Sequence, residues 1–375
     1  MSFNFGEKIK IQIFGQSHSQ NVGVVIDGLP AGFEIDFDRV DAFLKRRQGG
    51  KNHTTQRKED DAPKIVSGIF EGKTCGAPLT AIFENNDCRS EDYSKILNIP
   101  RPSHVDYFAK IKYEGNADYR GGGQFSGRLT LPLCFAGAVC LQILEARGVK
   151  IQSHILSIGG TKDKKYTLDY FCEDAKTIIK RVSSLDGNID VDKELKLSKH
   201  DVEFPLVDPS VKEKMLEEIF KYREQGDSIG GSIECAIMGI PVGIGEPMFD
   251  GVENKISTAI FAIPGIKGIE FGAGFEVCSM SGSENNDTYR YEDGKVVIES
   301  NNAGGIVGGI STGMPIIFRV AVKPTATISK AQNSINIIDK RNETIETKGR
   351  HDPCIVPRAV PCVEAAAAIA ILNLM

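Results

Sequence analysis

The sequence predicts a mixed α/β (α+β) fold whose neighbouring strands run antiparallel, and three observations support this prediction. Residues 8–14 alternate isoleucine with lysine and glutamine, which is the period-two pattern of a half-buried strand. The short polar loop 15–20 separates this run from a second apolar run at 21–27, so the two strands are close neighbours in the chain. The apolar stretch 129–147 is long enough for a buried helix and ends at Gly148, a common residue just past a helix C-terminus.

A helix is expected at residues 37–47, because Val40, Phe43 and Leu44 fall on one face. It ends in the run Lys45-Arg46-Arg47, and basic residues there favour the negative end of the helix dipole. The polar segment that follows, as far as Asp61, is interpreted as a solvated loop.

The segment 68–74, GIFEGKT, comes close to a phosphate-binding P-loop but does not satisfy it. Only three residues separate its glycines, where the motif requires four, and Ser67 stands where the first glycine should be. A hairpin turn between two strands is the better interpretation.

The second half of the chain predicts further helices and strands. Two amphipathic helices are expected at 166–184 and 209–225, the second with Asp208 as its N-cap. A strand follows the glycines of 227–231, and an alternating strand at 315–322 follows the glycine-dense loop 301–313. The Ala-rich segment 363–374 predicts a closing helix packed in the core.

The composition and charge of the chain argue against several classes of protein. The 375 residues carry a net charge of -5, which argues against a general nucleic-acid binder. Nine cysteines, an odd number without any C-x-x-C pair, support neither a disulfide framework nor a structural metal site, and we expect most of them to be reduced core residues. The N-terminal residues lack a hydrophobic signal core and no apolar run reaches membrane-spanning length, so a soluble, cytoplasmic protein without a membrane partner is expected.

The segment 101–128 is the strongest candidate for a binding site. It has little apolar periodicity but many aromatic residues, which predicts an ordered loop. Glycines 121–123 can let backbone N–H groups approach an anion closely, and the flanking Arg120 and Arg128 match phosphate or carboxylate oxygens. His104 lies two residues from Asp106, a carboxylate that would suit a proton-donating imidazole.

Two further polar clusters accompany this segment. Ser17 and His18 lie in the loop between the first two strands, but adjacent residues of an extended chain point to opposite sides, so a hydrolase nucleophile is not favoured. His18 remains a candidate proton donor on its own. Asp352, between a histidine and a proline, is a candidate for a fixed carboxylate.

These stretches together resemble the chorismate synthase family over essentially the whole chain. The stretches that carry the resemblance are FGQSHS, RRQGG, TTQRKEDD, IVSGIFEGKTCGAPL, NNDCRSEDYS, RPSHVD, DYRGGG, GDSIGG, NNAGGIVGGISTG, VKPTATIS and KGRHDPCIVPR. The resemblance implies a single domain over residues 1–375, built as a β-α-β sandwich with helices between antiparallel sheets. It also implies a homotetramer.

The resemblance implies an activity as well. Enzymes of this family convert 5-enolpyruvylshikimate 3-phosphate to chorismate by a 1,4-anti elimination of phosphate, using reduced FMN, in the shikimate pathway of aromatic amino acid biosynthesis. No G-x-G-x-x-G segment for NADPH follows a strand here, so we expect an external flavin reductase and only an indirect need for NADPH.

By position, the resemblance assigns roles to individual residues. The catalytic positions are His18, His104, Asp352 and Ser17. The substrate-binding positions are Arg46, Arg47, Arg120 and Arg128. The flavin-binding positions are Gln124, Phe125, Ser126, Pro264, Gly265, Gly308, Lys323, Pro324, Thr325, Ala326, Thr327 and Arg350.

The chain departs from the family pattern at several of these stretches. Gln124 and Phe125 replace an arginine and a serine of the flavin loop, and Ser103 replaces a glycine beside His104. An alternative hypothesis is therefore a flavin- or anion-binding paralogue without turnover. Flavin binding without phosphate release would distinguish the alternative from an active lyase.

Overall fold

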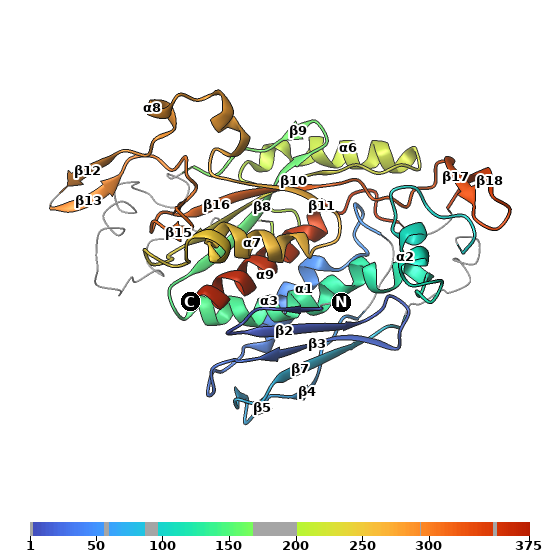
Figure 1. Cartoon of the computed structure of the whole chain (residues 1–375), viewed down its shortest axis with the longest axis horizontal. Helices are drawn as coiled ribbons and strands as arrows, with labels where there is room; N and C mark the ends of the chain where they lie inside the picture. Colours follow the sequence, from blue (N-terminus) through green and yellow to red (C-terminus); the bar gives the residue numbers. More distant parts are fainter. Residues whose placement is uncertain (1–2, 56–59, 87–96, 168–200, 293, 348–350) are drawn as a thin grey trace.

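A layer of helices lies between two antiparallel sheets, as Figure 1 shows for this computed structural model. The structure describes residues 3–55, 60–86, 97–167, 201–292, 294–347 and 351–375. The first sheet contains, in spatial order, β1 (Asn4–Phe5), β2 (Lys10–Gly15), β3 (Asn21–Asp27), β7 (Leu79–Glu84) and β4 (Lys64–Ser67). The second contains β11 (Ile266–Phe271), β16 (Ile316–Val322), β10 (Gly231–Met238), β8 (Lys150–Ile158) and β9 (Thr161–Lys162). The predicted β-α-β sandwich is confirmed.

The middle layer consists of α1 (Phe37–Arg47), α3 (Thr130–Glu145), α7 (Val252–Phe261) and α9 (Val356–Leu374). A side chain at Gly137 of α3 would overlap the backbone of Ala365 in α9, so these two helices are in direct backbone contact. Both are apolar on all sides because a sheet or another helix covers each face. Among the described residues, the stretches Arg120–Glu145 and Val356–Leu374 are long and apolar enough to cross a membrane, although no run of that length was expected from the sequence. Their apolar windows are 78% and 89% buried inside the protein, and packing between the sheets explains their hydrophobicity.

The remaining elements lie around this sandwich. Helix α6 (Lys212–Glu224) covers the outer side of the second sheet and follows a 3-10 turn, η4 (Pro209–Val211), that Asp208 caps. The other elements are α2 (Asp106–Lys112), α8 (Gly282–Asn285), the 3-10 turns η2 (Arg120–Phe125), η3 (Gly127–Leu129), η5 (Met248–Asp250) and η6 (Gly274–Ser279), and the hairpins β5–β6 (Ile69–Phe70, Lys73–Thr74), β12–β13 (Tyr289–Glu292, Lys295–Ile298), β14–β15 (Ile306–Val307, Ile310–Ser311) and β17–β18 (Gln332–Asn336, Arg341–Ile345).

Several local predictions are confirmed. Helix α1 has the predicted bounds, and Asp36 caps it by accepting a hydrogen bond from the Arg39 backbone. Strands β5 and β6 form the hairpin expected in place of a P-loop, with Glu71 and Gly72 both at positive φ in the turn. Gly148 and Gly226 were expected to end two helices. Both have positive φ just after α3 and α6, which is the usual backbone conformation of a glycine at that place.

Other local predictions need correction. The segment 101–128 is not a single loop, because it contains α2 and the two 3-10 turns. Strand β16 is buried on both sides instead of alternating, since β10 and β11 flank it inside the second sheet and further structure covers both faces.

The last helix and one amphipathic helix also differ from prediction. Helix α9 begins at Val356, seven residues before the predicted start, and it accommodates Pro361 in its interior. Proline is usually disfavoured inside a helix because it lacks a backbone N–H donor. Tyr166 and Thr167 are not helical, and the rest of the helix predicted at 166–184 lies outside the described residues.

Candidate active site

A cavity of about 660 Å³ lies at the end of the helical layer where α9 begins, away from the C-terminus marked in Figure 1. The ends of α1, α7 and β16, the turns η2 and η3, and the start of α9 all contribute to its wall. The predicted site residues that line it are Arg47, His104, Phe125, Ser126, Arg128, Pro264, Gly265, Lys323, Pro324, Thr325, Ala326, Thr327 and Asp352. Residues far apart in the sequence therefore meet at one place.

The cavity is basic although the whole chain is acidic. Its lining includes six basic side chains, Arg47, Arg101, Arg128, Lys267, Lys323 and Arg358, and two carboxylates, Asp61 and Asp352. Low-dielectric walls lined by charge of one sign focus the field, so this cavity attracts anions.

Asp61 holds two of these arginines together. Its carboxylate accepts hydrogen bonds from Arg128 and, at 3.3 Å, from Nη1 of Arg47, and all three side chains are buried. Arg47 Nε also donates to Thr130 Oγ1 at 2.7 Å. Burial lowers the pKa of Arg47, and the Asp61 charge only partly opposes this, so the guanidinium gains from a further anionic partner.

Asp352 is fixed by its neighbours, as the sequence suggested. Arg358 Nη1 donates to Asp352 Oδ2 at 2.5 Å, and the backbone N–H of Thr55 donates to Oδ1 at 2.8 Å. Arg358 Nε in turn donates to the backbone oxygen of Arg47 at 2.8 Å, which connects the start of α9 to the end of α1. The carboxylate is therefore oriented by two separate segments of the chain, and Arg358 connects it to a third.

His104 is oriented by Asp106 at the start of α2. Its Nδ1 lies 2.7 Å from Asp106 Oδ1, and Arg101 donates to the same carboxylate from Nε at 2.7 Å and from Nη2 at 2.8 Å. Burial acts to raise the pKa of Asp106, but the hydrogen bonds from Arg101 and His104 outweigh it and hold that pKa well below its usual range. An ionised carboxylate at Nδ1 leaves Nε2 of His104 available to exchange a proton.

The triple glycine brings the two candidate histidines close to each other. Glycines 121, 122 and 123 have φ values of 59°, 89° and 54°, which L side chains rarely adopt. A side chain at Gly121 would overlap Ser17 Oγ and come within 2.7 Å of His18 Cε1. One at Gly122 would come within 3.3 Å of His104 Nε2. His18 and His104 therefore pack against consecutive glycines, and Ser17 N–H donates to the oxygen of Gly123 at 3.0 Å.

The segment 323–327 forms another part of the wall together with residues 264–267. The Lys323 backbone N–H donates to the Gly265 oxygen at 2.9 Å, and Lys323 Nζ donates to the Ser103 oxygen at 2.9 Å. Burial and the charge of Lys267 lower the pKa of Lys323. Thr325 Oγ1 is a buried atom without a hydrogen-bond partner among the described residues, so it can bind a polar ligand group.

Some predicted residues lie elsewhere. Arg46 is directed into the helical layer, where it pairs with Glu364 at 2.5 Å, and Arg120 pairs with Asp118 at 2.8 Å. Gly308 lies in the β14–β15 hairpin, and neither it nor Gln124 lines the cavity. Gly121 lines the cavity. Ser17 and His18 contact Gly121 but do not line the cavity themselves. Arg350 lies outside the described residues.

Other residues of the cavity escaped prediction from the sequence. Thr55 and Asp61 belong to the segment interpreted as a solvated loop, yet both are buried. The Thr55 N–H donates to Asp352, and Asp61 pairs with the two buried arginines described above. Arg101, Lys267 and Arg358 also face the cavity. Arg101 and Arg358 carried a local signal, because Arg101 lies three residues before His104 and Arg358 lies six residues after Asp352. No cluster of metal ligands occurs in the described parts of the chain.

Comparison with known proteins agrees with this geometry. Residues 9–375 match the family model described as chorismate synthase. The chorismate synthase of Lancefieldella parvula is 43% identical, with 100% of this chain and 96% of the relative covered. That of Korarchaeum cryptofilum is 42% identical over 98% of this chain and 96% of its own length. A crystal structure of chorismate synthase superposes with a TM-score of 0.70 at 26% identity and covers 99% of this chain and 92% of that one. The chain belongs to the chorismate synthase family.

Proposed function

We propose that this chain converts 5-enolpyruvylshikimate 3-phosphate to chorismate by a 1,4-anti elimination of phosphate and a hydrogen, with reduced FMN as cofactor. Such a reaction makes it a carbon–oxygen lyase acting on phosphates. Family membership supports a lyase of aromatic amino acid biosynthesis.

The charge of the cavity supports a substrate of this class. The proposed substrate carries two carboxylates and a phosphate, and six basic side chains line the cavity against two carboxylates. Arg47 and Arg128 lie together on Asp61, so their guanidinium groups are held in place before an anion arrives. Such preorganisation reduces the entropy cost of binding.

The cavity also fits a flavin. Its volume of about 660 Å³ lies within the usual range for small-molecule sites, and Phe125 provides an aromatic surface in its wall. Thr325 Oγ1, which is buried and without a partner among the described residues, suits a polar edge or the phosphate of such a group. Bound reduced FMN would supply electron density to the allylic system of the substrate as phosphate leaves. Lys323, Thr325 and Thr327 are the residues that would hold it.

Proton handling is assigned to groups that the structure orients. We assign His18, with Ser17 beside it, to protonation of the departing phosphate oxygen. We assign His104, which Asp106 holds at Nδ1 and whose Nε2 lies against Gly122, to proton transfer near the flavin. Asp352 is the fixed carboxylate near the flavin segment and assists removal of the substrate hydrogen.

The observation that carries this proposal is the packing of His18 and His104 against Gly121 and Gly122 beside one basic cavity. The test is anaerobic turnover with photoreduced FMN and 5-enolpyruvylshikimate 3-phosphate, with phosphate and chorismate followed together. We expect both products in equal amounts, and losses of about 10²- to 10⁴-fold in His18→Ala and His104→Ala. Flavin binding without either product would instead establish the paralogue without turnover.

The source of reduced flavin, the oligomeric state and the location of the protein belong to the same proposal. We propose that reduced flavin comes from an external reductase, so that NADPH is needed only indirectly. We also propose a homotetramer in the cytoplasm. Sedimentation analysis of the purified chain tests the oligomeric state.

A further inference from the structure

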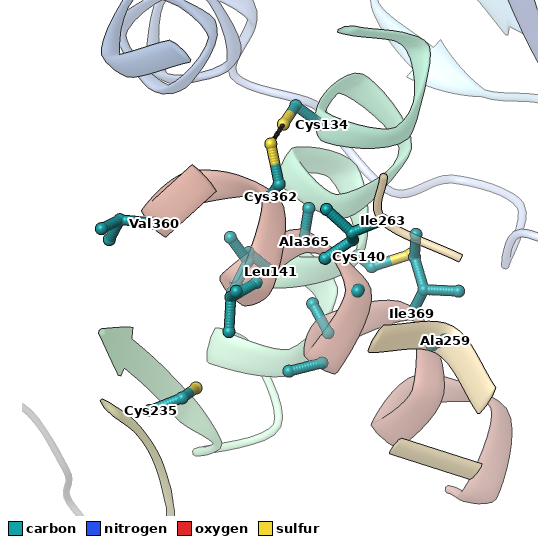
Figure 2. Close-up of a cluster of buried hydrophobic side chains, with 14 of the residues drawn as sticks. Cys134, Cys140, Leu141, Cys235, Ala259, Ile263, Val360, Cys362, Ala365 and Ile369 are labelled. Carbon is teal, nitrogen blue, oxygen red and sulfur yellow. Dashed lines mark hydrogen bonds between the residues drawn. The ribbon is translucent and has the colours of Figure 1, made fainter. Parts of the chain in front are cut away.

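Two cysteines meet at the wall of the cavity, and the proposed reaction uses neither. Figure 2 shows Cys134 of α3 and Cys362 of α9 directed toward each other. Their sulfur atoms are 3.7 Å apart, with the thiol of Cys134 donating to Cys362. Both side chains are buried, with Cys134 0% and Cys362 3% exposed, and Cys362 is also one of the cavity-lining residues. The cavity therefore borders Cys362, and the Cys134 sulfur contacts the Cys362 sulfur.

The helices themselves bring the two sulfur atoms together. One turn beyond the pair, Gly137 packs against the backbone of Ala365, so α3 and α9 approach as closely as two helices can. A disulfide requires Cα atoms within about 7 Å and an S–S bond of about 2.05 Å. The sulfur atoms, now 3.7 Å apart, therefore need to approach by about 1.7 Å to bond.

The environment of the pair makes the two thiols unequal. The hydrogen bond from Cys134, together with the charges of Arg47 and Arg358, lowers the pKa of Cys362, while burial opposes this effect. Burial and the neighbouring Cys362 raise the pKa of Cys134. The charges of Arg47 and Arg46 act to lower the pKa of Cys134 but do not outweigh these effects. Cys362 is accordingly the nucleophile and Cys134 the resolving thiol.

We propose that Cys362 and Cys134 form a thiol–disulfide exchange site that reacts with small anionic disulfides entering the basic cavity. Cys362 thiolate attacks one sulfur of the small disulfide, forms a mixed disulfide and releases one thiolate, which takes up a proton. Cys134 then attacks Cys362, the second small thiol leaves, and its proton comes from Cys134. In total two protein thiols are oxidised and one small disulfide is reduced to two thiols.

The other described cysteines separate this site from general thiol reactivity. Cys140, Cys235 and Cys354 are buried, and burial raises the pKa of each well above its usual value. Cys75 and Cys278 are exposed and do not line the cavity. We expect these two to form mixed disulfides that stop at the first step, without a preference for anionic reagents.

The test treats the native full chain without flavin or substrate, using 2,2′-dithiodiacetate as the anionic disulfide and cystamine as the cationic control. Peptide mapping after acid quench should show a Cys134–Cys362 disulfide that dithiothreitol reverses. It should form at least about tenfold faster with the anionic reagent. Cys134→Ala should stop at a mixed disulfide on Cys362, Cys362→Ala should leave Cys134 unmodified, and Cys140→Ala should behave as the unchanged chain. Circular dichroism confirms that each variant is folded.

Two results would overturn the proposal. One is modification confined to Cys75 and Cys278 while the native fold persists, with Cys134 and Cys362 alkylated only after denaturation. The other is equal rates with both reagents, which would show that the basic cavity is not the route of entry. Neither result depends on turnover, so the exchange site and the proposed lyase activity can fail separately.

Discussion

At the scale of single residues, the cavity depends on carboxylates that each hold two basic groups in place. Asp106 holds Arg101 and His104, and Asp61 holds Arg47 and Arg128. Nearby, Ser103 adopts φ +55°, a conformation that favours glycine, at the position where the resembled family has glycine. The chain keeps the shape of the loop there at some cost in backbone strain.

We expect Asp106→Asn to lower kcat by about 10²- to 10⁴-fold with little change in KM, because the amide no longer holds His104 as a proton carrier. The measurement is anaerobic steady-state turnover. Asp201→Asn, which removes a carboxylate paired with Lys212 outside the cavity, is the control and should keep normal kcat. An unchanged kcat in Asp106→Asn would contradict the role assigned to the pair.

The same substitution makes a prediction about pH. Because the folded pKa of Asp106 is depressed, its ionised form favours the folded state, and the contribution is fully present above the unfolded pKa of about 3.9. It is lost as pH falls through the folded value. The difference in free energy of unfolding between the unchanged chain and Asp106→Asn should therefore be largest above pH about 4 and shrink below it. Urea unfolding at several pH values measures this difference.

We expect Asp61→Asn to lower the free energy of unfolding by about 3–5 kcal/mol, because it leaves two buried guanidinium groups without their counter-charge. Asp61 has φ +55°, which asparagine tolerates, so the backbone itself is not disturbed. Asp41→Asn, in an exposed pair with Lys45, is the control and should change little. Added inorganic phosphate should restore part of the lost stability, whereas equal losses in the two variants would refute the argument.

At the scale of elements, the turn η2 requires glycine at consecutive positions, because its backbone adopts positive φ there. We expect Gly121→Ala to cost about 1–2 kcal/mol for its left-handed backbone alone. It should also abolish most turnover, because the new methyl group displaces Ser17 and His18. The control is Gly160→Ala in the turn between β8 and β9, which does not line the cavity and where the methyl group would meet open space. Thermal unfolding and turnover of both variants check the prediction, which fails if Gly121→Ala is as active as Gly160→Ala.

At the scale of the whole molecule, we propose one domain over residues 1–375, because both sheets pack on the same helices. Asn373 near the end of α9 also binds the start of the chain, accepting from the N–H groups of Glu7 and Ile9 and donating to the Ile9 oxygen at 3.0 Å. Calorimetry should show a single unfolding transition. Asn373→Ala should lower its midpoint through a loss of about 1–3 kcal/mol. Asn116→Ala, with only exposed local contacts, should not, and two separate transitions would disprove the single domain.

Local pattern was sufficient for several elements of the sandwich. Period-two alternation found β2, the 3.6-residue period found α1, and uninterrupted hydrophobicity found α3, because each pattern reflects which faces are buried. Pattern was insufficient where tertiary packing outweighs local preference. Helix α9 continues through Pro361 because the surrounding core holds it, and α2 forms within a segment that has little periodicity of its own.

The order of local motifs was enough to identify the family, and through that resemblance the fold and several of the polar groups that line the cavity. Which of those groups meet depends on the tertiary structure. It turned Arg46 toward Glu364, brought Asp61 between Arg47 and Arg128, and placed Cys362 against Cys134. Such contacts join residues many positions apart, and burial and charge, not sequence spacing, select them.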